Sequence, residues 1–158
     1  MTKTSDSAVP DSEYFERADV VADAVNVVRL REELEQWLRS QFVLDTLRLN
    51  DLVLAVNEAL ANVAEFAYRH APRIGAVELR AEYDRATSIL TITVADNGTW
   101  RGTNEREDKR TRGRGIPLME ALSDEVGIDA GDHGTTVCMK FGNIAVAATR
   151  RSDEVPTA

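Results

Sequence analysis

The sequence contains few of the residues that build disulfides, zinc sites and hydrolytic triads. It has one cysteine, Cys138, which excludes an internal disulfide and any zinc site with several cysteines. It has two histidines: His70 follows an expected helix end, and His133 falls in an expected turn. Neither has a nucleophile nearby in the pattern, so the sequence does not support a Ser-His-Asp hydrolase.

Long apolar runs are missing as well. No stretch approaches the roughly 18 consecutive apolar residues that a membrane-spanning helix needs. The N-terminus, MTKTSDSAVPDSE, is polar and acidic and lacks the order of a secretory signal. We therefore expect a cytoplasmic protein with no membrane segment.

Basic residues are outnumbered by acidic ones. The formal net charge is -8, which argues against a nucleic-acid binder because Lys and Arg supply most of the affinity for phosphate backbones. One basic cluster, RTRGR at 110–114, needs its own explanation, and a local phosphate ligand is one. The P-loop motif and the protein-kinase motifs H-R-D and D-F-G are absent, which excludes those two nucleotide-binding classes.

The 158 residues suit one domain. Polar, Ser- and Pro-containing ends predict flexible tails at 1–12 and 146–158, which leaves a domain at 13–145. Within it, hydrophobic periodicity predicts the following elements. They are helices at 23–40 and 45–68, a hairpin of strands 77–83 and 90–94, a charged loop at 99–112, a helix from Pro117, and a hairpin between 126 and 141.

Amphipathic helices and alternating strands in this order predict an α+β fold. We expect a two-layer sandwich in which a mixed, mostly antiparallel sheet carries its helices on one face.

Glu58 and Asn62 lie four residues apart in NEALAN, at 57–62 in the second expected helix. Side chains at this spacing project from the same face, one turn apart. The carboxylate could accept a proton, and the amide oxygen could ligate Mg2+. Taken alone, however, the segment is better explained as a solvated helix face.

In VADNG, at 94–98, Asp96 ends an apolar strand and Gly98 would let a ligand approach the backbone. An Asp in this place can accept a hydrogen bond from the amino group of a base. Asn-Gly is also a strong turn dipeptide, so by itself this segment is better explained as a turn.

The third segment is RTRGRGIPLMEAL, at 110–122, where Gly113 and Gly115 precede a helix whose first turn holds Pro117. Glycines that lead into a helix present backbone N–H groups and the positive end of the helix dipole to a phosphate. Nearby arginines would add charge-assisted contacts: Arg110, Arg112 and Arg114. A flexible loop with solvated basic residues is the alternative.

Taken together and in this order, the three segments resemble the N, G1 and G2 boxes of the GHKL ATPase/kinase superfamily. A fourth, GTTVCMKF at 134–141, resembles its final Gly-Thr segment. The resemblance extends over roughly 20–142, and the order of expected elements agrees between the boxes. Within the superfamily, the stretch GRGIPLMEALSDEVGID followed by GTTVCMKF is most similar to the bacterial anti-sigma-factor serine kinases.

The resemblance implies a role for each matched residue. Glu58 matches the general base, and Asn62 matches the ligand of the Mg2+ that bridges the ATP phosphates. Asp96 matches the carboxylate that reads the adenine amino group, with Gly98 beside it. The other nucleotide-binding positions are Gly113, Arg114, Gly115 and Ile116 in the phosphate lid, and Thr135 or Thr136 near the adenine. Arg112 is a candidate phosphate contact from its charge and location.

By this resemblance the protein is an ATP- and Mg2+-dependent serine-protein kinase and anti-sigma factor. It would phosphorylate a serine of an anti-anti-sigma partner of the STAS type, hold a sigma factor inactive and form a homodimer, without direct contact to nucleic acid. One position departs from the family pattern. The family often has His four residues after the Asn, where this sequence has Phe66 followed by Ala67.

Phe66 therefore leaves an alternative open, an ATP-dependent adaptor that sequesters a partner without phosphoryl transfer. Two other ATPase classes fit less well. The catalytic domain of a sensor histidine kinase would follow a histidine-bearing helix, and a gyrase- or chaperone-type ATPase needs further domains. The last alternative is an α+β domain that binds no nucleotide. It would require the four matching segments to occur in this order by coincidence.

Overall fold

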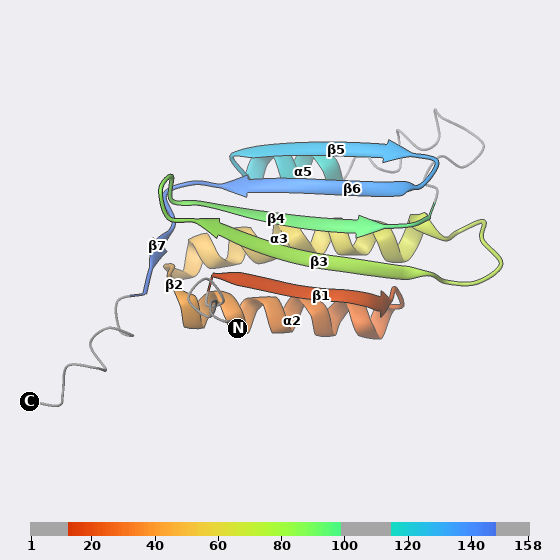
Figure 1. Ribbon diagram of the computed structural model, residues 1–158, viewed down its shortest axis with the longest axis horizontal. Helices are drawn as coiled ribbons and strands as arrows, with labels where there is room; N and C mark the ends of the chain where they lie inside the picture. The colour runs from red at the N-terminus through yellow and green to blue at the C-terminus, as the bar shows by residue number, and fades with distance from the viewer. Residues whose placement is uncertain (1–12, 99–114, 148–158) are drawn as a thin grey trace, which may run out of the picture.

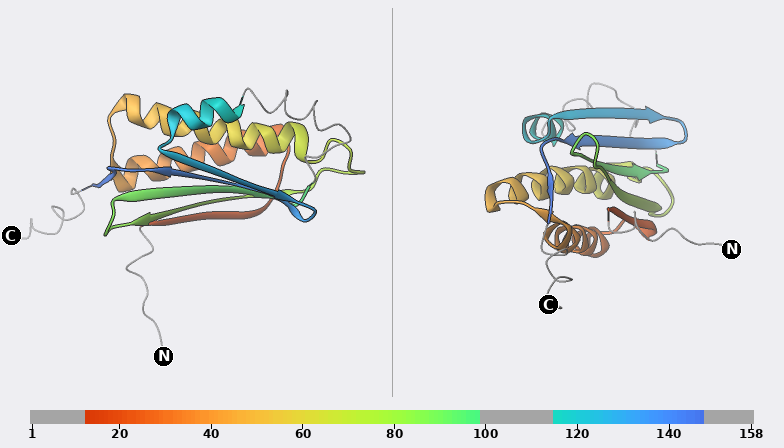
Figure 2. Two further views of the ribbon diagram at one scale, coloured as in Figure 1. Left: turned by 90° about the horizontal axis from the view of Figure 1, so that it is seen from above. Right: turned by 60° about the vertical axis from the view of Figure 1, so that its left-hand side comes forward.

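A computed structural model describes residues 13–98 and 115–147. Its helices cover one face of a five-stranded sheet, and no described helix lies on the other face (Figure 1, Figure 2). The helical elements are α2 (Ala24–Gln41), α3 (Thr46–Asn62), its π-helical continuation η2 (Val63–Ala67), and α5 (Gly115–Leu122). This arrangement confirms the expected two-layer α+β sandwich.

The main sheet has the strand order β1-β3-β4-β6-β5, and each of its pairings is antiparallel. Its strands are β1 (Tyr14–Val21), β3 (Ala76–Asp84), β4 (Ile89–Asp96), β5 (Glu125–Gly131) and β6 (Gly134–Phe141). The pairs β3–β4 and β5–β6 are the two predicted hairpins. A separate two-stranded sheet pairs β2 (Phe42–Val43) with β7 (Ala145–Val146).

The two long helices each begin at an aspartate that caps them. The Asp23 carboxylate accepts from the Asn26 N–H at 2.8 Å, and the Asp45 carboxylate accepts from the Arg48 N–H at 2.7 Å. Each cap satisfies one of the backbone donors that the first helical turn leaves without a partner. These caps fix where α2 and α3 start, within one residue of the predicted boundaries.

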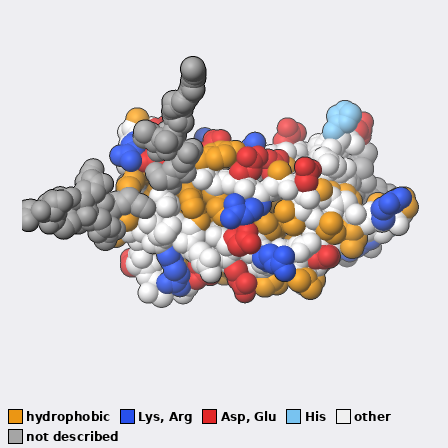
Figure 3. Space-filling model, turned by 60° about the horizontal axis from the view of Figure 1, so that its bottom comes forward, with side chains coloured by type: hydrophobic (Ala, Val, Ile, Leu, Met, Phe, Trp, Pro, Cys, Tyr) orange, Lys and Arg blue, Asp and Glu red, His pale blue; other side chains and the backbone are white. Residues whose placement is uncertain are grey.

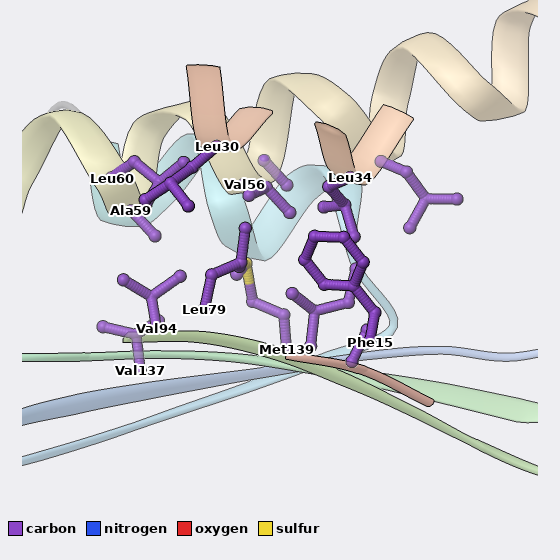
Figure 4. Packing of buried hydrophobic residues seen from close by; sticks show 14 of the residues in the cluster. Phe15, Leu30, Leu34, Val56, Ala59, Leu60, Leu79, Val94, Val137 and Met139 are labelled. Carbon is purple, nitrogen blue, oxygen red and sulfur yellow. The ribbon is translucent and has the colours of Figure 1, made fainter. Parts of the chain in front are cut away.

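The core lies between the helices and the sheet. Helix side chains meet strand side chains there (Figure 4). The labelled contributors are Leu30, Leu34, Val56, Ala59 and Leu60 from the helices, with Phe15, Leu79, Val94, Val137 and Met139 from the strands. Alternation along β4 and β6 sends every second residue into this layer, because successive strand side chains point to opposite faces.

The surface seen from the β1 and α2 side mixes hydrophobic side chains with charges of both signs (Figure 3). Arg17 of β1 and Glu33 of α2 form an ion pair here, with 2.7 Å between Nε and Oε1. Both side chains are well exposed, so the pair adds little to stability.

Within the described part of the chain, no helix is both long and apolar enough to cross a membrane.

The boundaries of two predicted helices differ from expectation. The α-helical geometry stops at Asn62 and is followed by the π-helical turn, so the helix changes geometry before its predicted end at 68. Helix α5 begins at Gly115, two residues before the expected Pro117. The predicted loop at 99–112 lies outside the described residues, as does the predicted tail at 1–12.

Strand β1 was not predicted, and its sequence explains why. In this strand Phe15 is the buried side chain, and the residues after it do not alternate. The register against β3 shifts between Arg17 and Val20, and Asp19 there has a φ of 56°. A bulge of this kind removes the period-two pattern that marks a strand. The short β2–β7 sheet was not predicted either, and it includes Val146, the first residue of the expected C-terminal tail.

Candidate functional site

The predicted site residues belong to elements whose ends meet at one end of the molecule. The end of α3, the end of β4 and the β5–β6 turn all lie at the right-hand end in Figure 1. Asp96 is the last residue of β4, and its register partner on β6 is Thr135. Both are buried and belong to the inward-facing series of their strands, next to Val94 on β4 and Val137 on β6. The structure therefore places Asp96 and Thr135 side by side on the helix-facing side of the sheet.

Thr136 is on the opposite face. Its register partners are Ala95 on β4 and Asp129 on β5, whose side chains point away from the helices. Of the two threonines that the resemblance implies near the adenine, Thr135 is the one that lies beside Asp96. Thr135 is only 2% exposed, and Thr136 is partly exposed on the uncovered face.

Asp96 is held in a tight turn with Gly98. The Gly98 N–H donates to Asp96 Oδ1 at 2.9 Å, which fixes the carboxylate relative to the backbone after the strand. A Cβ at position 98 would lie 2.0 Å from the Ala67 carbonyl oxygen, so this turn contacts the end of η2 directly. Gly98 therefore serves close backbone packing here, in addition to any approach by a ligand.

Gly134 was not singled out from the sequence, although the Gly-Thr segment contains it. Its φ is 132°, and a Cβ there would lie 1.9 Å from the Asp96 carbonyl oxygen and 2.9 Å from the Asn97 Cα. Only glycine can hold this backbone so close to the Asp96 turn. The signal available in the sequence was a glycine directly before Thr135, after a turn.

Asn62 ends α3 and is 6% exposed. Its Nδ2 is buried and has no hydrogen-bond partner within residues 13–98 and 115–147. A buried donor without a partner is costly, so a hydrogen-bond acceptor, such as a phosphate oxygen of a ligand, fits this position. Glu58 lies one turn earlier on the same helix and is partly exposed.

Tyr68 was missed entirely by the sequence analysis. Its hydroxyl donates to the Ala76 carbonyl at 2.5 Å and accepts from the Asn97 N–H at 3.0 Å. Burial raises the pKa of the Tyr68 hydroxyl, the Asn97 N–H opposes this, and the Asp96 carboxylate raises it further. Tyr68 thus contacts the Asp96 turn from the helix side.

Only part of the predicted phosphate lid can be placed. Gly115 begins α5, and Ile116 packs against the core, while α5 contacts α3. Arg112, Gly113 and Arg114 lie outside the described residues. No cluster of three His, Cys, Asp or Glu side chains that could hold a metal occurs among the residues placed in the structure. Proteins usually bind Mg2+ through few protein groups together with substrate phosphates and water, and the amide oxygen of Asn62 is the candidate protein ligand in this chain.

The residues present suit the nucleotide and ion that the four segments imply. The unpartnered Asn62 Nδ2 is a donor that a phosphate oxygen could accept from, and the Asp96 turn offers a carboxylate beside two glycines, Gly98 and Gly134. A carboxylate in this position can accept from a base amino group, and an amide oxygen is a ligand type that Mg2+ accepts.

Comparison with known proteins agrees with this geometry. The profile of the histidine kinase-like ATPase domain matches residues 20–141. Among solved structures, the crystal structure of the RsbU and RsbW domains of Rv1364c from Mycobacterium tuberculosis has the same fold, with a TM-score of 0.64 and 21% identity. That match covers 83% of this chain and 32% of that one, so this chain spans about a third of its length.

The matched profile includes α2, α3, the two hairpins and each of the four segments described above. It confirms the GHKL resemblance that the segments indicated, and the structural match confirms the fold. The chain belongs to the histidine kinase-like ATPase family.

Proposed function

We propose that this protein is an ATP- and Mg2+-dependent serine-protein kinase that also acts as an anti-sigma factor. Its partners would be an anti-anti-sigma protein of the STAS type, which carries the target serine, and a sigma factor, with the protein itself a homodimer. Membership of a histidine kinase-like ATPase family implies ATP binding. The pairing of buried Asp96 with buried Thr135, at the end of the fold where α3 ends at buried Asn62, supports the nucleotide pocket. The kinase and anti-sigma parts of the proposal are supported by the similarity to a structure that contains an RsbW domain.

In this proposal each residue has one task. Asp96 accepts from the adenine amino group, and Thr135 packs beside it. Asn62 holds the magnesium ion, and the start of α5 at Gly115 presents its backbone N–H groups to phosphate. Bound Mg2+ would neutralise phosphate charge. Glu58 takes the proton from the serine hydroxyl, and phosphoryl transfer otherwise requires mainly positioning and charge stabilisation.

Calorimetry of Mg2+-ATP binding tests the pocket. We expect wild type to bind, Asp96→Ala to lose binding, and Asn62→Ala to lose the magnesium dependence. Asp129→Ala and Asn50→Ala are matched controls, because both residues are exposed and Asp129 lies on the far face of the sheet. An absence of binding by wild type at millimolar ATP would contradict the proposal.

Transfer chemistry needs its own test because of Phe66. The centre of the Phe66 ring lies 4.7 Å from the Arg69 guanidinium, so an aromatic ring beside a cation stands where the family often has a histidine. Phe66 in place of that histidine is the observation in favour of the second candidate, an adaptor that binds ATP without transferring phosphate. Transfer of γ-labelled phosphate to a STAS-type partner by wild type, but not by Glu58→Gln, would support the kinase. ATP binding without any labelled partner would support the adaptor.

A further inference from the structure

One hydroxyl group joins three elements around the candidate adenine site. Tyr68 follows the π-helical turn η2, and its hydroxyl donates to the carbonyl of Ala76, the first residue of β3. The same oxygen accepts from the N–H of Asn97, directly after the last residue of β4. The end of the helix is therefore tied both to the start of β3 and to the turn that carries Asp96.

One edge of the partly buried Tyr68 ring packs closely against two glycines. A Cβ at Gly75 would lie 2.6 Å from Tyr68 Cε1, and a Cβ at Gly98 would lie 2.9 Å from the same atom. Side chains at these positions would occupy the space that the ring fills. The ring edge therefore packs against the backbone at Gly75 and Gly98, and the two hydrogen bonds hold the hydroxyl beside the turn.

The geometry of η2 brings Tyr68 to this place. In Val63–Ala67 the helix widens to the π form, and Tyr68 then leaves helical geometry with φ -117° and ψ 17°. π turns are rare and occur often at functional sites, because they redirect the side chains that follow. Here the redirected side chain is the one that reaches Asn97.

We propose that Tyr68 is a positioning residue for adenine recognition. Its hydroxyl holds the Asn97 N–H, and with the Gly98-to-Asp96 hydrogen bond this sets the direction of the Asp96 carboxylate. The residue does not touch the nucleotide; it acts through the turn. This inference rests on the proposed function, because it requires that Asp96 reads the adenine amino group.

The protonation state of Tyr68 agrees with this role. A hydroxyl that donates to Ala76 and accepts from Asn97 must be neutral, because a phenolate cannot donate. Burial and the Asp96 charge raise the pKa of Tyr68 despite the opposing Asn97 hydrogen bond, so the neutral form persists at physiological pH. Both hydrogen bonds are then present wherever the protein is folded near neutral pH.

The test compares two nucleotides and two tyrosines. The nucleotides are Mg2+-ATP and Mg2+-purine riboside triphosphate, and the second lacks the adenine amino group. Calorimetry measures their binding to wild type, Tyr68→Phe and Tyr83→Phe. Each protein is measured below its own unfolding temperature. Tyr83 is the matched control because its hydroxyl also donates to a backbone carbonyl, that of Ile144, at 2.6 Å. Tyr83 pairs with Leu90, at the opposite end of β4 from Asp96.

We expect Tyr68→Phe to weaken ATP binding about three- to tenfold, the effect of one ordinary hydrogen bond, and to leave purine riboside triphosphate binding unchanged. Tyr83→Phe should leave the affinities for both nucleotides as in wild type. Equal weakening of both nucleotides by Tyr68→Phe, or no change in either, would overturn the positioning role while wild-type ATP binding still supported the pocket. Absence of ATP binding by wild type would instead overturn the proposed function, and this inference with it.

Discussion

Gly98 and Gly134 bring two backbone segments against the Asp96 turn at distances that no side chain allows. A Cβ would lie 2.0 Å from the Ala67 oxygen in the first case and 1.9 Å from the Asp96 oxygen in the second. We expect Gly98→Ala and Gly134→Ala each to lower the free energy of unfolding by about 1–3 kcal/mol, the usual cost of overpacking. The positive φ of Gly134 should make its variant the worse of the two.

Urea unfolding measures this cost, and another glycine provides the control. Gly127 lies in β5 with nothing within 4 Å of an added Cβ, so Gly127→Ala should be neutral or slightly stabilising. If Gly98→Ala and Gly134→Ala unfolded at the same urea concentration as Gly127→Ala, the close contacts around Asp96 would not exist in solution.

Tyr68 also predicts how stability changes at alkaline pH. Its folded pKa is raised above the unfolded value of 10.0, mainly by burial. Above pH 10.0 the unfolded chain therefore loses this proton first, and stability must fall as pH rises through the folded pKa. Below pH 10.0 the stability that the protonated Tyr68 hydroxyl contributes is fully present.

Urea midpoints measured from neutral pH into this alkaline range should decline more steeply for wild type than for Tyr68→Phe. Burial also raises the pKa of Tyr14, so the comparison is between the two proteins and not with a flat baseline. Parallel curves for wild type and Tyr68→Phe would show that Tyr68 titrates as in the unfolded chain.

At the scale of elements, the two capping aspartates make a matched pair of predictions. Replacing Asp23 or Asp45 by Ala removes the acceptor for Asn26 N–H or Arg48 N–H and should cost about 1 kcal/mol in each case. Asn caps a helix as well as Asp, so Asp23→Asn and Asp45→Asn should retain most of the stability. Thermal unfolding of the four variants checks this, and an Ala variant as stable as its Asn counterpart would exclude a capping role.

Elements with a strong hydrophobic period could be predicted from the sequence, and those without one could not. Helices α2 and α3 and both hairpins follow from spacing alone. Strand β1 was missed because its bulge at Asp19 breaks the alternation, and β2 and β7 are too short to show any. The π form of η2 is invisible to periodicity because its five residues continue an apolar helix pattern.

The sequence was enough to predict the segments of the candidate site, but not which of their residues contact one another. Thr135 lies two and four residues before the buried Val137 and Met139, so strand alternation alone places its side chain on the same buried face. The same alternation places Thr136 on the opposite face. Tyr68 and Gly134 could not be found this way. Their contacts with Asn97 and Asp96 join residues that are far apart in the sequence, and only the register of β4 against β6 and the turn after η2 bring them together.

At the scale of the whole molecule, stability depends on the layer between helices and sheet. Leu34 of α2 is fully buried there, whereas Leu47 of α3 is 71% exposed. Leu34→Ala should lower the free energy of unfolding by about 2–5 kcal/mol, since it removes buried methyl groups and leaves a cavity. Leu47→Ala should stay within about 0.5 kcal/mol of wild type, as surface changes usually do. Similar urea midpoints for both variants would contradict the observed packing of α2 on the sheet.

Nucleotide binding should stabilise the fold as a whole, because Asn62, Asp96 and Thr135 come from elements that also build the core. A ligand at 100 times its Kd that binds only the folded state adds about 2.7 kcal/mol, which corresponds to a rise in Tm of roughly 5–11 °C for a chain of this size. We expect this rise with Mg2+-ATP for wild type and also for Leu34→Ala, whose site residues are intact. Asp96→Ala should show none. Scanning calorimetry with and without nucleotide measures it, and an equal rise in Asp96→Ala would mean that ATP binds elsewhere on the protein.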